Sequence, residues 1–93
     1  MEEKFLQSLE KARLEAQVLG VRIRPIGDMT AAHRCLSGHR ESDGFWQLAD
    51  KKRLDLSLEA LSVNKQFTGL FSDEEANNAL TRLMEAGYFL IGR

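Results

Sequence analysis

The residues most able to do chemistry lie together in the stretch HRCLSGHR, at positions 33–40. This stretch contains both histidines of the chain, its only cysteine and two arginines. Imidazole and thiolate are zinc ligands, a cysteine beside cations can act as a nucleophile, and arginines can hold a phosphate. A fourth possibility is that the stretch is simply the end of a helix, and the spacing of its residues decides between the four.

A structural zinc site needs four ligands in tetrahedral geometry, and His33, Cys35 and His39 supply only three. His33 and Cys35 are two positions apart, so a helix points them to different sides. Gly38 is expected to end that helix before His39. A carboxylate such as Asp43 would have to complete the set, and we therefore predict no metal site.

Cys35 is also a weak candidate for a catalytic thiol. It falls in the last part of its predicted helix, where the helix dipole disfavours a thiolate. It shares a face with Ala32 and Leu36, so we predict that it packs inward as a small hydrophobic residue. Arg34 and Arg40 can bind an anion or complement the last carbonyls of the helix. We favour the helix end.

The element with the clearest hydrophobic spacing is a helix predicted over residues 2–19, followed by Gly20 as its terminator. Its apolar stripe has three-and-four spacing and consists of Phe5, Leu9, Ala12, Ala16 and Leu19. Leu14 and Val18 lie four apart on the opposite side of this helix. Either another part of the chain covers them or they contact a second molecule.

Between this helix and the HRCLSGHR stretch, the sequence VRIRPI alternates apolar and basic residues. This alternation predicts a half-buried strand over 21–26. Pro25 has no amide hydrogen to donate, so the strand is expected to lie at a sheet edge or to end at Pro25. Asp28 or Thr30 is then expected to cap a short helix that runs to Ser37.

Residues 44–58 are open to two predictions. Leucines alternate with polar residues in LDLSL, at 54–58, as they do in strands, and GFWQLA before them suits the partner strand of a hairpin. A helix over 45–53 is the competing prediction. We favour the hairpin.

The remaining elements are helices predicted over 58–67 and 72–86 and a final strand over 88–92. Ser72 and Glu75 form a capping-box pattern at the start of the second of these helices. Its predicted buried stripe is Ala76, Leu80, Leu83 and Met84. Together these elements predict an α+β fold for a single domain, residues 1–93, with a small, mostly antiparallel sheet packed against helices in the order αβαββααβ.

Composition and charge exclude several classes of protein. The net charge is −1, with seven bases against four acids in residues 21–53, which is far from the basic surface of a typical nucleic-acid binder. A single cysteine excludes an internal disulfide. The charged N-terminus is unlike a signal peptide, and no apolar run has the length of a membrane span. We therefore expect a cytoplasmic protein without a membrane segment.

No pattern typical of an enzyme or a cofactor site is present. The sequence lacks the glycine-rich phosphate loops and the G-x-S-x-G pattern of hydrolases. The acidic run 73–75 is explained by helix capping, and no pair of carboxylates is flanked by residues that would desolvate it. We expect no enzymatic activity and no cofactor.

One alternative function follows from the order of the last elements. A short helix, a turn, a longer helix over 72–86 and a strand over 88–92 form an order similar to the core of a winged-helix DNA-binding domain. That similarity implies a DNA-binding transcriptional regulator in which the longer helix reads DNA. Arg82 is the only base in this helix, against four acids, so nucleic acid is the less favoured partner.

The favoured hypothesis is a non-enzymatic protein–protein interaction module, such as a small adaptor, inhibitor or regulatory factor, which also suits a homodimer. Tryptophan and arginine are enriched at binding hot spots. If 44–49 is a strand, Phe45 and Trp46 project from opposite faces, and Trp46 is either exposed for a partner or covered as core. The candidate partner-binding residues are Trp46, Arg22, Arg24, Leu14, Val18, Lys51, Lys52 and Arg53.

Overall fold

The computed structural model describes residues 2–38 and 40–88, and in this part of the chain it contains helices and no strands. The α-helices are α1 (Glu2–Val18), α2 (Met29–Ser37), α3 (Phe45–Asp50), α4 (Leu58–Ser62) and α5 (Asp73–Glu85). Two 3-10 helices, η1 (Leu54–Leu56) and η2 (Lys65–Leu70), flank α4. No helix in the described ranges is long and apolar enough to cross a membrane.

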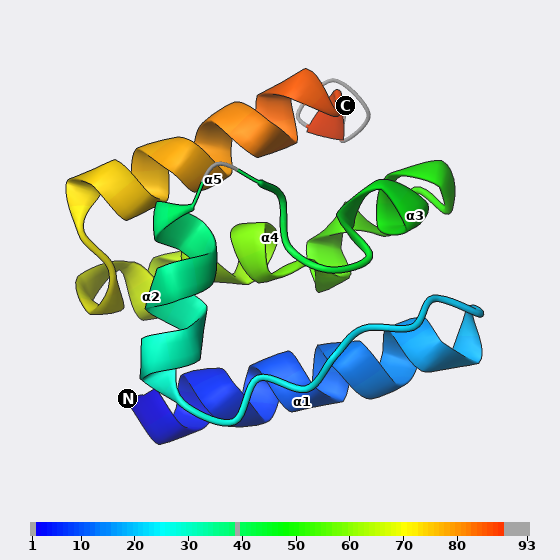
Figure 1. Ribbon diagram of the computed structural model, residues 1–93, viewed down its shortest axis with the longest axis horizontal. Coiled ribbons are helices and arrows are strands. Elements are labelled where there is room, and N and C mark those ends of the chain that lie inside the picture. The colour runs from blue at the N-terminus through cyan, green and yellow to red at the C-terminus, as the bar shows by residue number, and fades with distance from the viewer. Residues whose placement is uncertain (1, 39, 89–93) are drawn as a thin grey trace.

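The helices are arranged around α4, which contacts α1, α5, η1 and η2. Figure 1 shows α1 and α5 along opposite edges of the molecule, with α4 between them and α2 running from one edge toward the other. Residues 21–27 form an extended segment, which we call the strap, and this segment returns alongside α1 to the start of α2. The helical elements and the strap together surround the core.

The predicted α+β fold is wrong, because none of the predicted strands forms within the described residues. The strap has extended backbone, but no neighbouring strand pairs with it. The Arg24 amide donates instead to the side chain of Asp43, at 2.8 Å. Tyr88 is not in a strand, and the rest of the predicted strand 88–92 lies outside the described residues.

The predicted hairpin over 44–58 is wrong as well, and helical structure takes its place. FWQLAD forms α3, with Gly44 before its first residue, and Phe45 and Leu48 are buried at a helical spacing of three. The alternating leucines Leu54 and Leu56 are both buried in η1, whose turn is closed by a hydrogen bond from the Ser57 amide to the Leu54 carbonyl, at 2.9 Å. The Ser57 side chain then caps α4, so this backbone is satisfied locally and needs no partner strand.

Four predicted helices are present. α1 buries four residues of its predicted stripe, Phe5, Leu9, Ala12 and Ala16, whereas Leu19 lies after the end of the helix and is partly buried. Asp28, rather than Thr30, caps α2 by accepting from the Ala31 amide. The predicted helix 58–67 is divided into α4 and η2, and α5 begins with the predicted capping box of Ser72 and Glu75.

The buried face of α5 differs from the predicted one. Its buried residues are Glu75, Ala79, Arg82 and Leu83. Met84, which the predicted stripe includes, is 65% exposed. The face is rotated because Arg82 packs inward against a buried carboxylate, Glu59, as described below.

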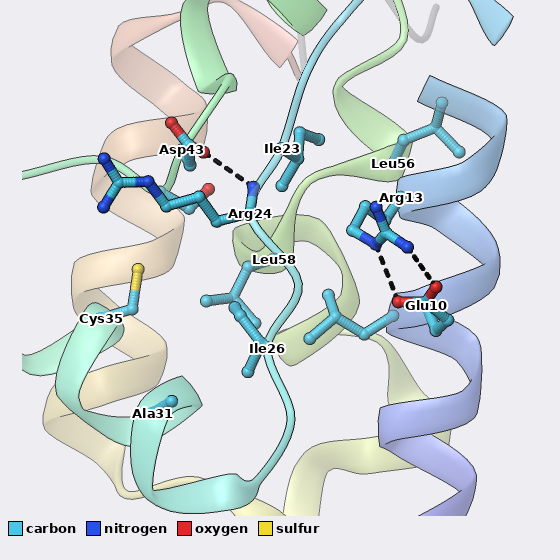
Figure 2. Close-up of a pocket in the computed structure, with 12 residues that line it drawn as sticks. Glu10, Arg13, Ile23, Arg24, Ile26, Ala31, Cys35, Asp43, Leu56 and Leu58 are labelled. Atoms are coloured by element: carbon cyan, nitrogen blue, oxygen red, sulfur yellow. Dashed lines mark hydrogen bonds and ion pairs between the residues drawn. The ribbon is translucent and has the colours of Figure 1, made fainter. Parts of the chain in front are cut away.

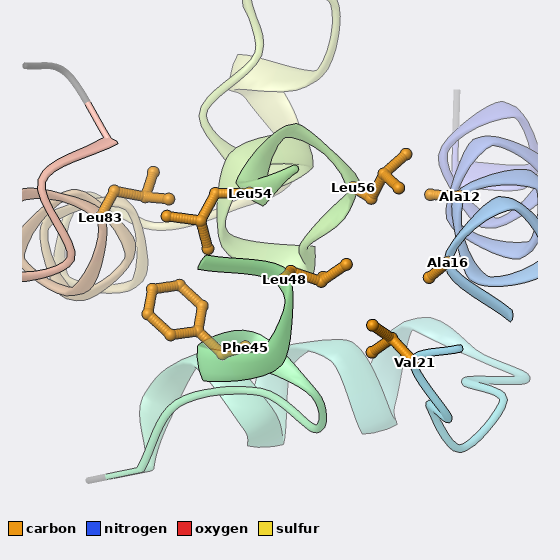
Figure 3. Packing of buried hydrophobic residues seen from close by; sticks show 8 residues of the cluster. All are labelled: Ala12, Ala16, Val21, Phe45, Leu48, Leu54, Leu56 and Leu83. Atoms are coloured by element: carbon orange, nitrogen blue, oxygen red, sulfur yellow. The ribbon is translucent and has the colours of Figure 1, made fainter. Parts of the chain in front are cut away.

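Two hydrophobic clusters make up the core. The first lies between α1 and α5 and is shown in Figure 3: Ala12, Ala16, Val21, Phe45, Leu48, Leu54, Leu56 and Leu83. The second is formed by residues of α1, α2, α4, η2 and α5: Phe5, Leu9, Ala32, Leu36, Leu58, Phe67 and Ala79. Leu61 and Val63 pack against both clusters and join them into one core.

Candidate functional site

In the described part of the HRCLSGHR stretch, residues 33–37 form the second half of α2, and Gly38 and Arg40 lie beyond its end. His33 Nδ1 lies 2.7 Å from Oε2 of Glu75 on α5. His39 lies outside the described residues. Within the described ranges, no group of three or more His, Cys, Asp or Glu residues is close enough to hold a metal ion. His33 is thus engaged in an interhelical contact.

Cys35 packs against the second cluster and is half-buried. Burial raises the pKa of its thiol, and the nearby Glu59 carboxylate raises it further. The thiol therefore stays protonated at neutral pH, a state in which it is a weak nucleophile. This environment suits a packing side chain better than a catalytic one.

The end of α2 is complemented by an arginine from another helix. Arg82 Nη2 donates to the carbonyls of Gly38, at 2.7 Å, and Leu36, at 3.3 Å. Arg34 and Arg40, which the sequence suggested for this role, are exposed. A cation does complement the C-terminal carbonyls as expected, but α5 supplies it.

Arg82 also forms a buried ion pair with Glu59, at 3.1 Å from Nη1 to Oε2. The Glu59 side chain is fully buried, and it accepts from both the amide and the hydroxyl of Ser42. The network joins α4, α5, the end of α2 and the loop before α3. Sequence reasoning missed it, although Glu59 directly follows a buried leucine and Arg82 follows Ala79 at a helical spacing of three.

Five of the predicted partner-binding residues lie at or near one end of the molecule. Leu14 is 50% exposed and Val18 is 86% exposed, on the side of α1 opposite to its buried stripe. Arg53 Nη2 lies 3.3 Å from Glu15 Oε1, so the turn that contains residues 51–53 lies against α1. We call Leu14, Val18, Lys51, Lys52 and Arg53 the α1–turn surface.

The other three predicted residues have different neighbours. Arg22 lies beside α1 in a shallow hollow that it shares with Arg13 and Gln17. Arg24 is attached through its amide to Asp43, in the loop before α3. Trp46 is 51% exposed, and its indole Nε1 donates to Glu41, at 3.2 Å. The Arg24 amide and the Trp46 indole thus have their partners in residues 41–43, whereas Arg22 lies beside α1.

A cavity that no sequence pattern indicated lies between α1, the strap and α2. Its volume is about 320 Å³. Figure 2 shows Glu10 and Arg13 of α1 on one side of the strap and Cys35 of α2 on the other. The walls are mainly apolar: Leu9, Ile23, Ile26, Ala31, Leu56 and Leu58.

Comparison of this chain with protein-family models, with curated proteins and with solved structures gives no significant match.

Proposed function

We propose that this protein is a non-enzymatic interaction module that binds another protein through the α1–turn surface. The observation that carries the proposal is the exposure of Leu14 and Val18, neither of which is covered by the described chain. Two aliphatic side chains one helical turn apart form the kind of anchor that fits a pocket or groove on a partner.

The charges around these anchors indicate the chemistry of the partner. Lys51 and Lys52 are exposed at the turn, and Lys11 is exposed one turn before Leu14 on α1. Arg53 is already paired with Glu15 and Asp55. The positive charge of the three lysines favours a partner that carries acidic residues around an apolar contact, because complementary potentials speed encounter and fix orientation.

The small apolar area favours a transient complex over a permanent homodimer. Obligate dimer interfaces bury about 2,000 Å² or more and are strongly hydrophobic. The described chain exposes 6160 Å² in total, and the two anchors cover only a small part of it. A heterologous partner is therefore the occupant that we propose, and self-association is an outcome that the experiment distinguishes.

DNA binding receives no support from α5, the helix that would read the bases. Its only base, Arg82, is buried against Glu59 and the end of α2. Its exposed residues include Asp73, Glu74 and Glu85, which repel phosphates.

The test is affinity capture from a lysate of the source organism with matched variants. We expect one protein to be retained by the wild type and by Met84→Ser, which changes a similarly exposed apolar residue on α5. Leu14→Ser/Val18→Ser and Lys51→Glu/Lys52→Glu should each lose it. Retention by both double variants, or loss with Met84→Ser, would contradict the proposal.

Light scattering and DNA titration complete the test. The proposal expects a monomer of 10.5 kDa at micromolar concentration. A dimer that Leu14→Ser/Val18→Ser dissociates would show that the occupant is a second copy. Duplex binding that weakens steeply with salt would instead support the DNA-binding alternative.

A further inference from the structure

The cavity between α1, the strap and α2 has the properties of a small-molecule site. Its volume of about 320 Å³ is at the lower end of the range for ligand pockets, roughly 300–1,000 Å³. Residues from four parts of the chain enclose it: Leu9 of α1, Ile23 and Ile26 of the strap, Leu58 of α4 and Cys35 of α2. It is separate from Leu14 and Val18, which face away from the core.

Several polar groups at the rim already have partners. Arg13 donates from Nε to Glu10, at 2.8 Å, and these two side chains neutralise each other. Asp43 accepts from the Arg24 amide. The Cys35 thiol is protonated, because burial raises its pKa. The exposed Arg24 guanidinium also lines the rim, so it is the apolar walls, in which an ionised group would lose its hydration, that favour an uncharged ligand.

The volume sets the size of the ligand. A dry apolar cavity of about 150 Å³ takes benzene, so a space about twice as large suits a bicyclic aromatic ring. We propose that this cavity binds one small, uncharged, apolar molecule of about the size of a bicyclic aromatic ring. This binding would be a second property of the chain and does not depend on the α1–turn surface.

The strap is the wall of the cavity with the fewest backbone attachments. Its backbone belongs to no helix or strand, and its described attachments include the bonds from the Val21 amide to Ala16 and from the Arg24 amide to Asp43. Displacing Ile23 and Ile26 breaks far fewer backbone hydrogen bonds than opening a helix would. The apolar side chains of the strap then close over the ligand.

Indole is a suitable probe because it is uncharged, bicyclic and close to the expected size. We expect saturable shifts of the backbone amide resonances of Ala31, Cys35 and Leu58 on titration with indole. Indole-2-carboxylate adds a charge to the same ring, and it should bind at least about tenfold more weakly. Equal binding of both compounds, shifts centred on Trp46, or no saturable shift would overturn the proposal.

A cavity-filling variant tests the location. Ala31→Leu places a larger side chain in the cavity and should weaken indole binding about tenfold or more. Thr30→Leu is the control, since Thr30 is exposed on the same turn of α2 and does not line the cavity. Unchanged binding by folded Ala31→Leu would contradict the proposed site.

The reactivity of Cys35 gives a second readout that needs no variant. Bound indole should slow the reaction of this thiol with N-ethylmaleimide in proportion to occupancy, because Cys35 lines the same cavity. If Ala31→Leu fails to fold, as judged by circular dichroism, this measurement decides. A modification rate that saturating indole leaves unchanged would overturn the proposal.

Discussion

At the scale of single residues, the main feature of the molecule is a buried charge pair that takes part in several contacts. Glu59 is fully buried and Arg82 nearly so, and the side-chain hydrogen bonds of this pair join different elements. Removing one partner leaves the other charge buried and unpaired, which costs far more than the pair itself contributes. The pair thus fixes how α4, α5 and the end of α2 meet.

We predict that Arg82→Met lowers the free energy of unfolding by about 3–5 kcal/mol, because it leaves Glu59 without its counter-charge. Adding Glu59→Leu should recover a large part of this loss, since the buried carboxylate is then removed. Urea denaturation followed by circular dichroism measures both effects. Arg34→Met is the control, because Arg34 is exposed on α2. A single variant as stable as this control would contradict the prediction.

Glu75 makes stability depend on pH. Burial alone raises the pKa of this carboxyl, but the hydrogen bond from the Ser72 amide and the contact with His33 outweigh it and hold the pKa below its ordinary value of 4.5. A lowered pKa stabilises the fold above the unfolded-state value, and this contribution is lost as the pH falls through the folded-state value.

From about pH 5 to about pH 3, we therefore expect the wild type to lose more stability than Glu75→Gln. Glutamine keeps an oxygen that accepts from the Ser72 amide, so the capping box survives at both pH values. Urea midpoints at the two pH values measure the difference. Glu74→Gln removes the same charge from an exposed neighbouring position and should keep the wild-type pH dependence. Equal pH dependence in Glu75→Gln and the wild type would argue against this role.

At the scale of elements, the strap and the loop before α3 approach each other closely at Gly44. This glycine has a φ of +76°, and a Cβ there would lie 2.8 Å from Ile23 Cγ1 and 3.0 Å from Val21 Cγ1. Gly87 has the same φ of +76°, but nothing lies within 4 Å of the corresponding position. The two glycines therefore have the same left-handed backbone conformation, which would strain any other residue. They differ in that only at Gly44 would an added side chain meet neighbouring atoms.

We predict that Gly87→Ala costs about 1–2 kcal/mol, from the left-handed backbone alone. Gly44→Ala should cost about 1–3 kcal/mol more, because the added methyl group must displace Ile23 and the buried Val21. Thermal unfolding of the two variants gives the difference directly. If they are equally stable, the strap does not pack against the loop as described.

The sequence allowed helices to be predicted wherever a local signal marks them. α1, α2 and α5 each have apolar spacing together with a terminator or a cap, and all three were predicted within a few residues. The strand predictions over 21–26 and 44–58 were wrong because alternation shows only which side chains are buried. Leu54 and Leu56 are indeed buried, but whether a partner strand exists depends on the rest of the chain.

The candidate sites were predictable to different degrees for the same reason. Exposure of Leu14 and Val18 follows from their place on one helix, so spacing alone indicated it. The cavity and the Glu59–Arg82 pair are formed by residues distant in the sequence, 23 positions apart for the pair. No local pattern carries that information.

At the scale of the whole molecule, the two hydrophobic clusters are parts of one core. Leu61 and Val63 pack against both clusters, and α1 contributes buried residues to each. Because these residues contact both clusters, the unfolding of one cluster removes packing contacts from the other. We therefore expect cooperative unfolding of the whole core, as in most small domains.

Trp46 makes this cooperativity measurable. Its ring lies edge-on to Phe45 of the first cluster, with ring centroids 5.3 Å apart, so its fluorescence reports on that cluster. Phe5→Leu alters only the second cluster and should cost about 1 kcal/mol, which lowers the unfolding temperature by about 4–8 °C in a domain of this size. The Trp46 transition should move by the same amount as the circular dichroism transition.

Phe45→Leu, the same change in the first cluster, should also shift both signals together. A Trp46 transition that Phe5→Leu leaves in place would mean that the clusters unfold independently, and that Leu61 and Val63 do not couple them.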